Sequence, residues 1–527
     1  MKTKTRIGYL FLVPALAVAL MLPVADQAVA AAFTTLHSFA TTSGNGTNSD
    51  GAFLFGGLIL SGSTLYGTAN TGGTGGEGTV FGINTDGTIF TNLHSCPVLA
   101  STPAGIATNS DGANPFAGLM LSGGALYGTA TVGGTNGNGT VFAINTNGTG
   151  FRVIHHFMAS GLNNLSGLFT NNDGISPYGG LILSGNTLYG TVANGGTNDS
   201  GTVFAVNTNG TGFTILHAFS ARAGSNATNS DGKFPNASLV LSGNSLFGTT
   251  QTGGTNGNGT VFAVNTSGTG FTTLHTFGPS KTNPNGVFTN ADGYLPLSSL
   301  TISGNTLFGT TLGGGTNGTG TVFAINTNGT GFTTLYAFSA AIYTNSFGVK
   351  TNSDGVNLFS GLLLSGNTLY GTAKLGGTNG VGTVFAVNTN GTGFTTLYTF
   401  TADIYTNSSG TKTNSDGADP RGELVLSGNT LYGTTSIGGI NGKGTVFGLS
   451  FPAPQLTINL YGTNAVLTWP TSVAGFSYSG LALESATNLG NPSVWNSVAL
   501  LPAVVNGQNT VTNPIISPQQ FFQLSQW

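Results

Sequence analysis

The chain has 527 residues, of which 5 % are charged, against roughly 25 % in ordinary globular domains, and 87 are Gly. Without the first thirty residues, nine Lys and Arg face fourteen Asp and Glu, so no basic cluster is available to neutralise nucleic-acid phosphates or to attract a membrane surface. A single cysteine excludes an intramolecular disulfide framework.

Residues 1–30 are typical of a secretory signal peptide. Three basic residues precede an apolar stretch from Ile7 to Pro23, and Ala28-Val29-Ala30 fits a small-residue cleavage site. The alternative is an uncleaved membrane anchor, but Pro14 and Pro23 shorten the apolar run well below the ~20 residues that a span needs. We therefore expect an exported mature chain, extracellular or associated with the cell surface, that begins near Ala31 and has no membrane span.

A repeat occupies residues 31–451. Each copy begins with Leu, followed by Tyr or Phe, Gly and Thr, and successive copies start 58 to 62 residues apart. The seven opening residues are Leu65, Leu126, Leu188, Leu246, Leu307, Leu369 and Leu431. Each copy holds four short apolar runs rich in Thr, Val, Phe and Tyr, which Gly and Asn turns separate. This pattern predicts a four-stranded antiparallel sheet per copy and an all-β, seven-bladed β-propeller for the whole region.

The turns place the four strands of a copy. In the first copy we expect strand A at Gly57–Ser61, strand B at Thr64–Thr68, strand C at Gly78–Asn84 and strand D at Phe90–Cys96. Tight Gly and Asn turns join A to B and C to D. The connections from B to C and from D to the next A are longer, so one face of the propeller carries the long loops and the other carries the short turns.

The two ends of the repeat region complete one another. The last copy stops after its strand C at Gly444–Leu449, whereas the mature chain begins with a lone strand D at Phe33–Phe39. We expect this N-terminal strand to pair in the last blade and to close the ring. A β-solenoid is the structural alternative, but it needs coils of roughly 20 to 25 residues and gives no reason for a displaced first strand.

The repeated Leu-Tyr-Gly-Thr, Gly-Gly and Gly-Thr-Val-Phe series, with Asp-Gly ahead of each strand A, resembles the bacterial tandem-repeat family called GloVer, the "choice-of-anchor" proteins. The resemblance covers Phe33 to Phe451 and implies a repeat fold and a surface location, not an activity. More distantly the unit is similar to a kelch blade, because Gly-Gly follows strand B and an aromatic residue opens strand D. The sequence departs from the anchor part of the family, since no sorting motif with an apolar helix and a basic tail is visible before Trp527.

A second domain is expected after the Pro-rich linker at 452–454. Residues 455–527 hold short apolar runs around Trp469 and Trp495 and end on a Phe-Phe-x-Leu run, which resembles a small fibronectin type III β-sandwich. Such modules commonly act as spacers or adaptors, which is an analogy to other proteins.

Two sets of repeated polar residues could suggest metal binding. An Asp precedes Gly in every D to A loop, and a His or Tyr occupies one position of every strand D. The Asp residues are Asp50, Asp111, Asp173, Asp231, Asp292, Asp354 and Asp416, and the His and Tyr residues are His37, His94, His155, His217, His275, Tyr336 and Tyr398. One carboxylate per blade does not give a calcium ion the six to eight oxygens it prefers, so we interpret the Asp residues as turn residues. The His and Tyr side chains are interpreted as packing groups with a hydrogen-bonded tip, and we expect no metal and no cofactor.

Cys96 stands where the other six copies carry Phe. We therefore interpret it as a buried apolar substitute rather than a nucleophile.

The positions at which the copies differ are the candidate site. Five residues after each Asp, at the start of strand A, stand Phe55, Phe116, Tyr178, Asn236, Leu297, Phe359 and Arg421, with Glu423 nearby. On the innermost strand these residues would line the channel mouth beside the longest loops, where aromatic rings, an amide and charges could hold a sugar or peptide. Packing between blades is the alternative interpretation.

Two classes of function stay open. The first is a secreted or cell-surface, non-catalytic propeller, expected to be a monomer, that binds a glycan or protein partner on its long-loop face. The second is a secreted propeller enzyme that acts on polysaccharide as a hydrolase or lyase. An enzyme needs acid, base or metal groups gathered in one cleft, and the sequence does not group them; no catalytic residue is assigned.

Overall fold

The computed structural model describes most of the chain, and every regular element in the described part is a β-strand. The described residues are 6–7, 31–163, 168–221, 228–284, 286–340, 343–344, 350–402, 405–406, 412–473, 476–478, 481–487, 495–515 and 520–526. None of these residues lies in a helix, so no helix with the length and hydropathy of a membrane span occurs among them. The expected signal peptide falls outside the described residues except for strand β1 (Arg6–Ile7).

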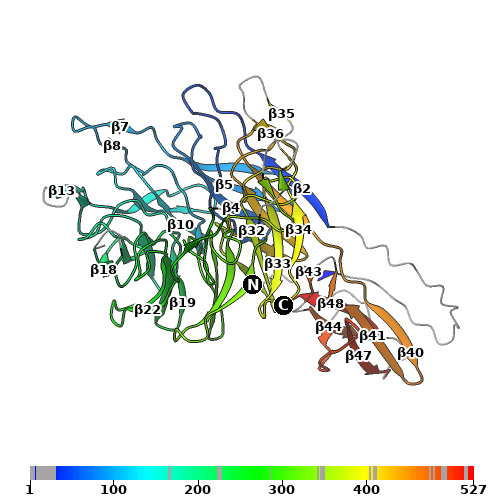
Figure 1. Cartoon of the computed structure of the whole chain (residues 1–527). Coiled ribbons are helices and arrows are strands. Elements are labelled where there is room, and N and C mark those ends of the chain that lie inside the picture. The colour runs from blue at the N-terminus through cyan, green and yellow to red at the C-terminus, as the bar shows by residue number, and fades with distance from the viewer. Residues whose placement is uncertain are drawn as a thin grey trace.

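Seven four-stranded antiparallel sheets form the repeat region, as the four apolar runs of each copy predict (Figure 1). The sheets are β3 (Ile59–Ser61), β4 (Thr64–Ala69), β5 (Thr79–Asn84) and β6 (Phe90–Ser95); β9 (Met120–Ser122), β10 (Ala125–Ala130), β11 (Thr140–Asn145) and β12 (Arg152–His156); β15 (Ile182–Ser184), β16 (Thr187–Val192), β17 (Thr202–Asn207) and β18 (Thr214–Ala218); β19 (Val240–Ser242), β20 (Ser245–Thr250), β21 (Thr260–Asn265) and β22 (Thr272–Thr276); β25 (Thr301–Ser303), β26 (Thr306–Thr311), β27 (Thr321–Asn326) and β28 (Thr333–Ala337); β31 (Leu363–Ser365), β32 (Thr368–Ala373), β33 (Thr383–Asn388) and β34 (Thr395–Thr399); and β37 (Val425–Ser427), β38 (Thr430–Thr435) and β39 (Thr445–Ser450) with β2 (Ala32–Ser38). In the order of this list they are called repeat sheets one to seven.

The Gly of each Leu-Tyr-Gly-Thr motif has a packing reason. Gly67 pairs directly with Phe81 on the neighbouring strand, and a Cβ atom at Gly67 would lie 2.7 Å from the Phe81 ring. The same Gly and Phe pair recurs in the other six repeat sheets. A glycine in a strand interior weakens the strand. Here the missing side chain leaves space for the fully buried Phe81 ring to lie over the neighbouring strand.

Strand β2 is hydrogen-bonded along β39, although some four hundred residues separate them in the chain. Phe33 is the register partner of Leu449, and Ser38 is the partner of Thr445. The backbone N–H of Phe39 also donates to the carbonyl oxygen of Gly444 at 3.1 Å, and the Phe39 side chain is fully buried. The N-terminal segment therefore supplies the fourth strand of repeat sheet seven.

Threonine hydroxyls link each repeat sheet to the next. The Thr of each Leu-Tyr-Gly-Thr motif donates to a backbone carbonyl at the start of the following sheet. The bonds are Thr68 to Ala117 at 2.8 Å, Thr129 to Gly179 at 3.0 Å, Thr191 to Ala237 at 2.8 Å, Thr249 to Ser298 at 3.1 Å, Thr310 to Ser360 at 3.1 Å, Thr372 to Pro420 at 3.4 Å and Thr434 to Gly56 at 3.1 Å. The last of these bonds joins sheet seven to sheet one.

A backbone strain recurs at one position in every copy, three residues after the Asp of each Asp-Gly pair. The residues with positive φ at this position are Phe53, Asn114, Ser176, Phe234, Leu295, Asn357 and Asp419, with φ between 54° and 62°. Each donates its N–H to a carbonyl of the preceding repeat sheet's B to C loop, as Ser176 does to Asn138 at 3.1 Å. In the first copy Phe53 donates to Lys443 of repeat sheet seven at 3.0 Å. The strained conformation is therefore part of the contact between neighbouring sheets.

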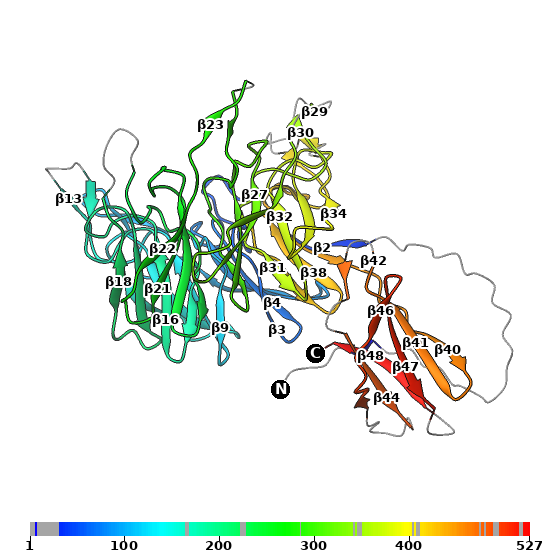
Figure 2. The same ribbon diagram turned by 60° about the horizontal axis from the view of Figure 1, so that its bottom comes forward.

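Five long D to A loops form small hairpins of their own, which the sequence interpretation did not foresee. They consist of β7 (Ala100–Ser101) with β8 (Ala107–Thr108), β13 (Gly161–Asn163) with β14 (Leu168–Thr170), β23 (Lys281–Thr282) with β24 (Phe288–Thr289), β29 (Tyr343–Thr344) with β30 (Lys350–Thr351), and β35 (Tyr405–Thr406) with β36 (Lys412–Thr413). Figure 2 shows β13, β23 and β29 projecting from the same side of the repeat sheets. In these hairpins, part of the backbone N–H and C=O groups of the long loops form hydrogen bonds within the same loop.

The C-terminal region, together with β1, forms two four-stranded sheets beside the repeat sheets (Figures 1 and 2). One holds β40 (Thr457–Tyr461), β41 (Asn464–Pro470), β47 (Gln508–Pro514) and β46 (Ala503–Val505); the other holds β1, β48 (Phe521–Gln526), β44 (Leu481–Ala486) and β45 (Asn496–Ser497). A hairpin of β42 (Ser472–Val473) and β43 (Phe476–Ser477) completes the region. Trp469 and Phe522, from different sheets, lie in one buried cluster, so the two sheets share a core.

An aromatic contact holds this C-terminal module against repeat sheets six and seven. The Phe476 ring stacks on Phe451 at a centroid distance of 4.4 Å. The backbone N–H of Ser477 donates to the Tyr370 hydroxyl at 3.0 Å, and Tyr370 is fully buried. The contact lies beside the short turns, on the side away from the D to A hairpins (Figure 2).

Candidate functional site

The repeated Asp residues and the His and Tyr residues of strand D are partners. The distances between their polar atoms are 2.8 Å for His37 and Asp50, 3.0 Å for His94 and Asp111, 3.0 Å for His155 and Asp173, 3.0 Å for His217 and Asp231, 2.9 Å for His275 and Asp292, 2.8 Å for Tyr336 and Asp354, and 2.7 Å for Tyr398 and Asp416. Each pair ties the end of one strand D to the loop that leads into the next sheet. We expected a hydrogen-bonded tip on each His and Tyr. In six pairs the structure identifies the hydrogen-bond partner as the neighbouring Asp, whereas His94 Nε2 lies 3.0 Å from Asp111 without the geometry of a hydrogen bond.

These carboxylates are already engaged by protein donors. Asp173, for example, accepts hydrogen bonds from His155 and from the backbone N–H of Met158. Burial acts to raise the pKa of the Asp231 carboxyl, but hydrogen bonds from His217 and Ser220 outweigh it, and the pKa lies below its ordinary value. In the part of the chain that the structure describes, no three His, Cys, Asp or Glu side chains gather as a possible metal site.

The first copy, which forms repeat sheet one, differs from the others at this point. Cys96 is 4 % exposed, and burial raises the pKa of its thiol to about 12, so the residue is a thiol and not a thiolate nucleophile at neutral pH. Burial also lowers the pKa of His94, while the neighbouring Asp111 opposes that shift.

The seven residues expected at the channel mouth do lie together. They are called the rim: Phe55, Phe116, Tyr178, Asn236, Leu297, Phe359 and Arg421. All seven are half-buried and line one cavity of about 260 Å³, to which Gln251 also contributes. The amide of Asn236 donates to Gln251 at 2.7 Å. Sequence reasoning missed Gln251, although its position after strand B also differs from copy to copy and could have revealed it.

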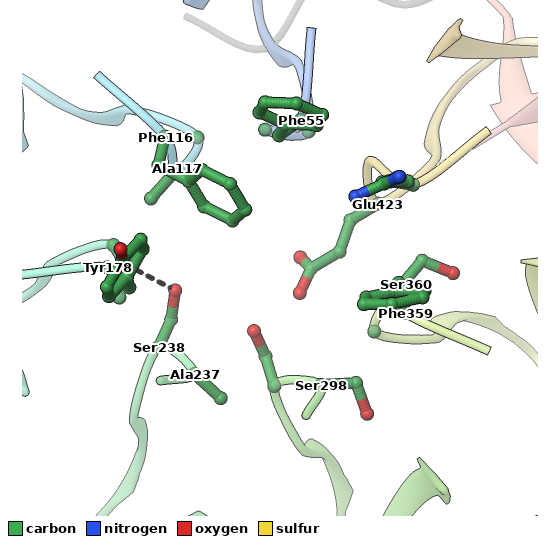
Figure 3. A pocket seen from close by; sticks show the side chains of 18 of the residues that line it. Phe55, Phe116, Ala117, Tyr178, Ala237, Ser238, Ser298, Phe359, Ser360 and Glu423 are labelled. Atoms are coloured by element: carbon green, nitrogen blue, oxygen red, sulfur yellow. Dashed lines mark hydrogen bonds between the residues drawn. The ribbon is translucent and has the colours of Figure 1, made fainter. Parts of the chain in front are cut away.

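Rim side chains contact one another from sheet to sheet. Phe55 and Phe116 stack at 4.8 Å, and Phe116 meets the edge of Tyr178 at 5.2 Å (Figure 3). The packing interpretation therefore holds for part of the rim. The rings still face a cavity, so packing and ligand contact are compatible roles for them.

Arg421 is held in place by its neighbours. Its guanidinium lies 5.0 Å from the centroids of both Phe55 and Phe359, and it makes two hydrogen bonds to Asp419, of 2.7 and 3.2 Å. A paired and sandwiched guanidinium is rigid, and its charge is largely balanced by the carboxylate. Arg421 thus shapes the rim more than it offers a free positive charge.

Glu423 lies deeper than the rim, at the position we call the lumen ring: Gly57, Gly118, Gly180, Ser238, Ser299, Gly361 and Glu423. Six copies carry Gly or Ser at this position, and the seventh carries the carboxylate, which Figure 3 shows pointing toward the middle of the cavity. The cavity measures about 290 Å³. The Glu423 side chain is exposed to the lumen and has protein around it on the other sides. This burial raises the pKa of its carboxyl, and the neighbouring Ser299 side chain offsets part of that shift.

The long side chain of Glu423 occupies space that larger residues at neighbouring positions of the lumen ring would fill. Its carboxylate passes over Gly361 to the Ser299 side chain, and a Cβ atom at Gly361 would overlap the Glu423 Oε1 atom. A side chain at Gly57 would also lie 3.0 Å from the Cβ atom of Glu423. The lumen is therefore shaped for one long acidic side chain.

A second cavity of about 650 Å³ lies between the short turns of repeat sheet six and the C-terminal module. Asn367 and Asn390 line it on one side and Tyr478 and Asn509 on the other. The sequence interpretation placed the binding site on the long-loop face and did not foresee that the C-terminal module docks beside the short turns.

The chain was compared with known proteins. A tandem-repeat family described as the "Gloeobacter/Verrucomicrobia repeat" matches residues 26–169, 160–348 and 287–467. These segments span most of the chain, so the protein belongs to this repeat family. The tandem-repeat assignment is thereby confirmed, and the family description names no activity. The curated proteins contain no match to the sequence.

The solved structures that match this chain share little sequence with it. A puromycin hydrolase is 11 % identical with a TM-score of 0.42, and the match covers 82 % of this chain and 61 % of that one. An oligogalacturonate lyase in complex with manganese is 10 % identical with a TM-score of 0.39, covering 80 % and 97 %. A chain of a nidogen/laminin complex is 14 % identical with a TM-score of 0.30, covering 52 % and 75 %. At these scores the similarities support no assignment of activity.

Proposed function

We propose that this protein is a secreted or cell-surface, non-catalytic β-propeller that binds a glycan or protein partner at its rim. The observation that carries the proposal is the gathering of residues that differ from copy to copy in one cavity, at the end of the sheets where the long loops lie. Binding residues concentrate at variable positions on a rigid scaffold. Four aromatic rings beside an amide suit the apolar faces and hydroxyls of a sugar, or a peptide side chain.

The finer architecture in this proposal is a ring of seven blades that β2 closes. Three contacts between repeat sheets seven and one support closure: the Thr434 to Gly56 hydrogen bond, the Phe53 to Lys443 hydrogen bond, and the His37 ring, which stacks on Phe90 at 4.0 Å. In a closed ring no sheet presents a free face, which removes the surface that an open array has to cap.

The remaining parts of the proposal come from the sequence. Export rests on the N-terminal signal-like segment, and the kelch-like character rests on the Gly-Gly turns. For the C-terminal module we propose a fibronectin type III-like adaptor, supported by its two sheets around Trp469. We propose that the protein is a monomer.

A glycan array probed with the mature protein, with and without calcium, tests this function. With the ligand found, Tyr178→Ala is expected to weaken binding by about 1 to 3 kcal/mol, the usual effect of truncating a contact that matters. Arg421→Ala is expected to weaken it by a similar ~1 to 3 kcal/mol, because Phe55 and Phe359 lose the group between them.

Asn147→Ala and Asn209→Ala on short C to D turns are matched controls, expected to leave affinity unchanged. If these variants lose binding while the rim variants keep it, the rim is the wrong site. Turnover of a polysaccharide by the protein would overturn the non-catalytic part of the proposal in favour of the enzyme.

A further inference from the structure

Glu423 is out of place in an otherwise small and uncharged ring. The equivalent residue of every other copy is Gly or Ser, so nothing in the repeat requires a carboxylate here. The first residues of strand A pack in the six other copies without a carboxylate at this position. Placing a carboxylate where protein surrounds it costs free energy unless a positive group or a hydrogen bond compensates.

The two positive side chains near the rim, Arg421 and Lys374, contact groups other than the Glu423 carboxylate. Arg421 is bonded to Asp419, and the Lys374 ammonium lies 5.3 Å from the centroid of the Phe359 ring. Burial lowers the pKa of the Lys374 ammonium, and the neighbouring Asp419 carboxylate opposes that shift. Neither positive group is paired with the Glu423 carboxylate, and the Ser299 side chain is the polar neighbour that lowers the pKa of this carboxyl against the effect of burial.

We propose that the lumen binds a primary ammonium group, carried on a slender arm that enters through the rim and ends at the Glu423 carboxylate. This inference rests on the proposed function and specifies it, because it gives the rim ligand one positive charge. The shared chemistry has two sources, the side chain of a lysine in a protein partner and the amine of an amino sugar.

The shape of the site suits such an arm. The rim cavity of about 260 Å³ and the lumen cavity of about 290 Å³ share Phe55, Phe116, Tyr178 and Arg421 among their lining residues, so an arm can pass from one to the other. Aromatic rings attract cations, and Arg421 between Phe55 and Phe359 already shows that these rings accept one. An ammonium group offers three donors, which match the carboxylate and the Ser299 hydroxyl.

Other ligands fit the lumen less well. A calcium ion prefers six to eight oxygen ligands, whereas side chains supply one carboxylate and a few hydroxyls here. An anion would be repelled by Glu423. A neutral sugar would leave the carboxylate without a positive partner.

Calorimetric titration with N-acetyl-lysine methylamide and with glucosamine, each beside its neutral counterpart N-acetyl-norleucine methylamide or glucose, tests the inference. We expect at least one amine to bind about 10- to 100-fold more tightly than its neutral counterpart, as a charge-assisted hydrogen bond allows. The amine that shows this preference identifies the source. Affinity should fall as the pH is lowered, because protonation removes the charge of Glu423.

Glu423→Gln keeps the shape and removes the charge, and it is expected to abolish the preference for the amine. Its folding is checked by the melting temperature, which should be equal or higher at pH 7 because a carboxyl with a raised pKa destabilises the folded state above its unfolded pKa of about 4.3. The same comparison near pH 4 should show no difference. Glu77→Gln, in a B to C loop, is the matched control and should bind like the wild type.

Equal binding of amine and neutral probe, or a preference that survives Glu423→Gln, would overturn the inference. That result leaves the rim function intact, since Tyr178→Ala tests it separately with the array ligand. Loss of array binding in Glu423→Gln but not in Tyr178→Ala would instead keep the lumen site and overturn the rim.

Discussion

The outer ends of the repeat sheets and the inner starts of their first strands treat the repeat differently. At the outer end all seven copies build one contact, an Asp carboxylate within 3.0 Å of a His or Tyr side chain. The His or Tyr ring stacks on an aromatic residue of a neighbouring sheet, as the centroids of His155 and Phe213 lie 3.8 Å apart. At the inner end the seven rim residues include five residue types.

This difference separates structural positions from candidate binding positions. A contact that recurs in each copy holds neighbouring sheets together, because each copy faces the same neighbour. A position that varies although its surroundings repeat is free of that requirement. The comparison predicts that changes at the outer contacts reduce stability and leave binding intact. Changes at the rim are predicted to reduce binding and leave stability intact.

The largest effect should come from removing β2, which takes the outer contacts away from one whole sheet. Deletion of residues 31–40 exposes β39 and removes the fully buried Phe39. We expect no cooperative unfolding transition, or a melting temperature lowered by roughly 10 °C or more. Differential scanning calorimetry of the purified variant measures this.

Removal of residues 1–30 alone is the control and should leave the transition of the repeat region in place, because β1 pairs with β48 of the C-terminal module and not with a repeat sheet. Adding a synthetic 31–40 peptide to the shortened protein should recover part of the stability, while a scrambled peptide should not. A shortened protein that melts like the complete one would show that β2 is dispensable.

A smaller loss is expected from Asp231→Asn, which breaks one outer contact. The amide cannot accept from His217, Ser220 Oγ and the Ser220 backbone N–H as the carboxylate does. We expect about 2 to 3 kcal/mol lower stability at pH 7 in urea unfolding. Because the pKa of Asp231 is depressed in the folded state, its contribution is present above the unfolded pKa of about 3.9 and is lost as the pH falls further, so the difference should shrink there.

Asp86→Asn is the matched control. Asp86 accepts hydrogen bonds from Thr88 in an exposed C to D turn, where four other copies already carry Asn. It should change stability little. Equal losses in the two variants would contradict a special role for the Asp and His pairs.

The smallest effect concerns the strained position between sheets. Ser176 has φ of 62°, and no hydrogen bond of its side chain to the described residues accompanies its backbone bond to Asn138. Ser176→Gly should raise stability by about 0.5 to 1 kcal/mol, because Gly adopts this conformation without strain. Ser176→Val should lower it by about 1 to 2 kcal/mol, since a branched side chain fits there poorly. If both variants unfold like the wild type in urea, no strain is stored at this position.

Much of the repeat region could be predicted because its signals are local. The strand expected at Thr64–Thr68 is observed as Thr64–Ala69, and the one at Phe90–Cys96 as Phe90–Ser95. Because the pattern occurs seven times, a strand whose signal is weak in one copy can be identified from the other copies. The positive φ at Ser176 and its equivalents was not foreseen, because the residue type at this position changes from Phe to Asn, Ser, Leu and Asp, and the conformation is imposed by a hydrogen bond to the neighbouring sheet.

At the site, sequence could place residues but not their partners. The rim was found from the spacing after Asp, and the seven residues do share a cavity. The pairing of Arg421 with Asp419 and the reach of Glu423 to Ser299 depend on side-chain directions that no period reveals. The docking of the C-terminal module through Phe476 joins segments with no common pattern.

The pairing of β2 with β39 also sets an order of assembly. A ribosome makes β2 before the first complete repeat and β39 at the end of the last one. Until that moment Phe33 lacks Tyr398 and Phe447, the rings on which it stacks, and repeat sheet seven lacks its outer strand. The final docking step therefore occurs only in a full-length repeat region, and an incomplete chain keeps an exposed strand that proteases and chaperones can recognise.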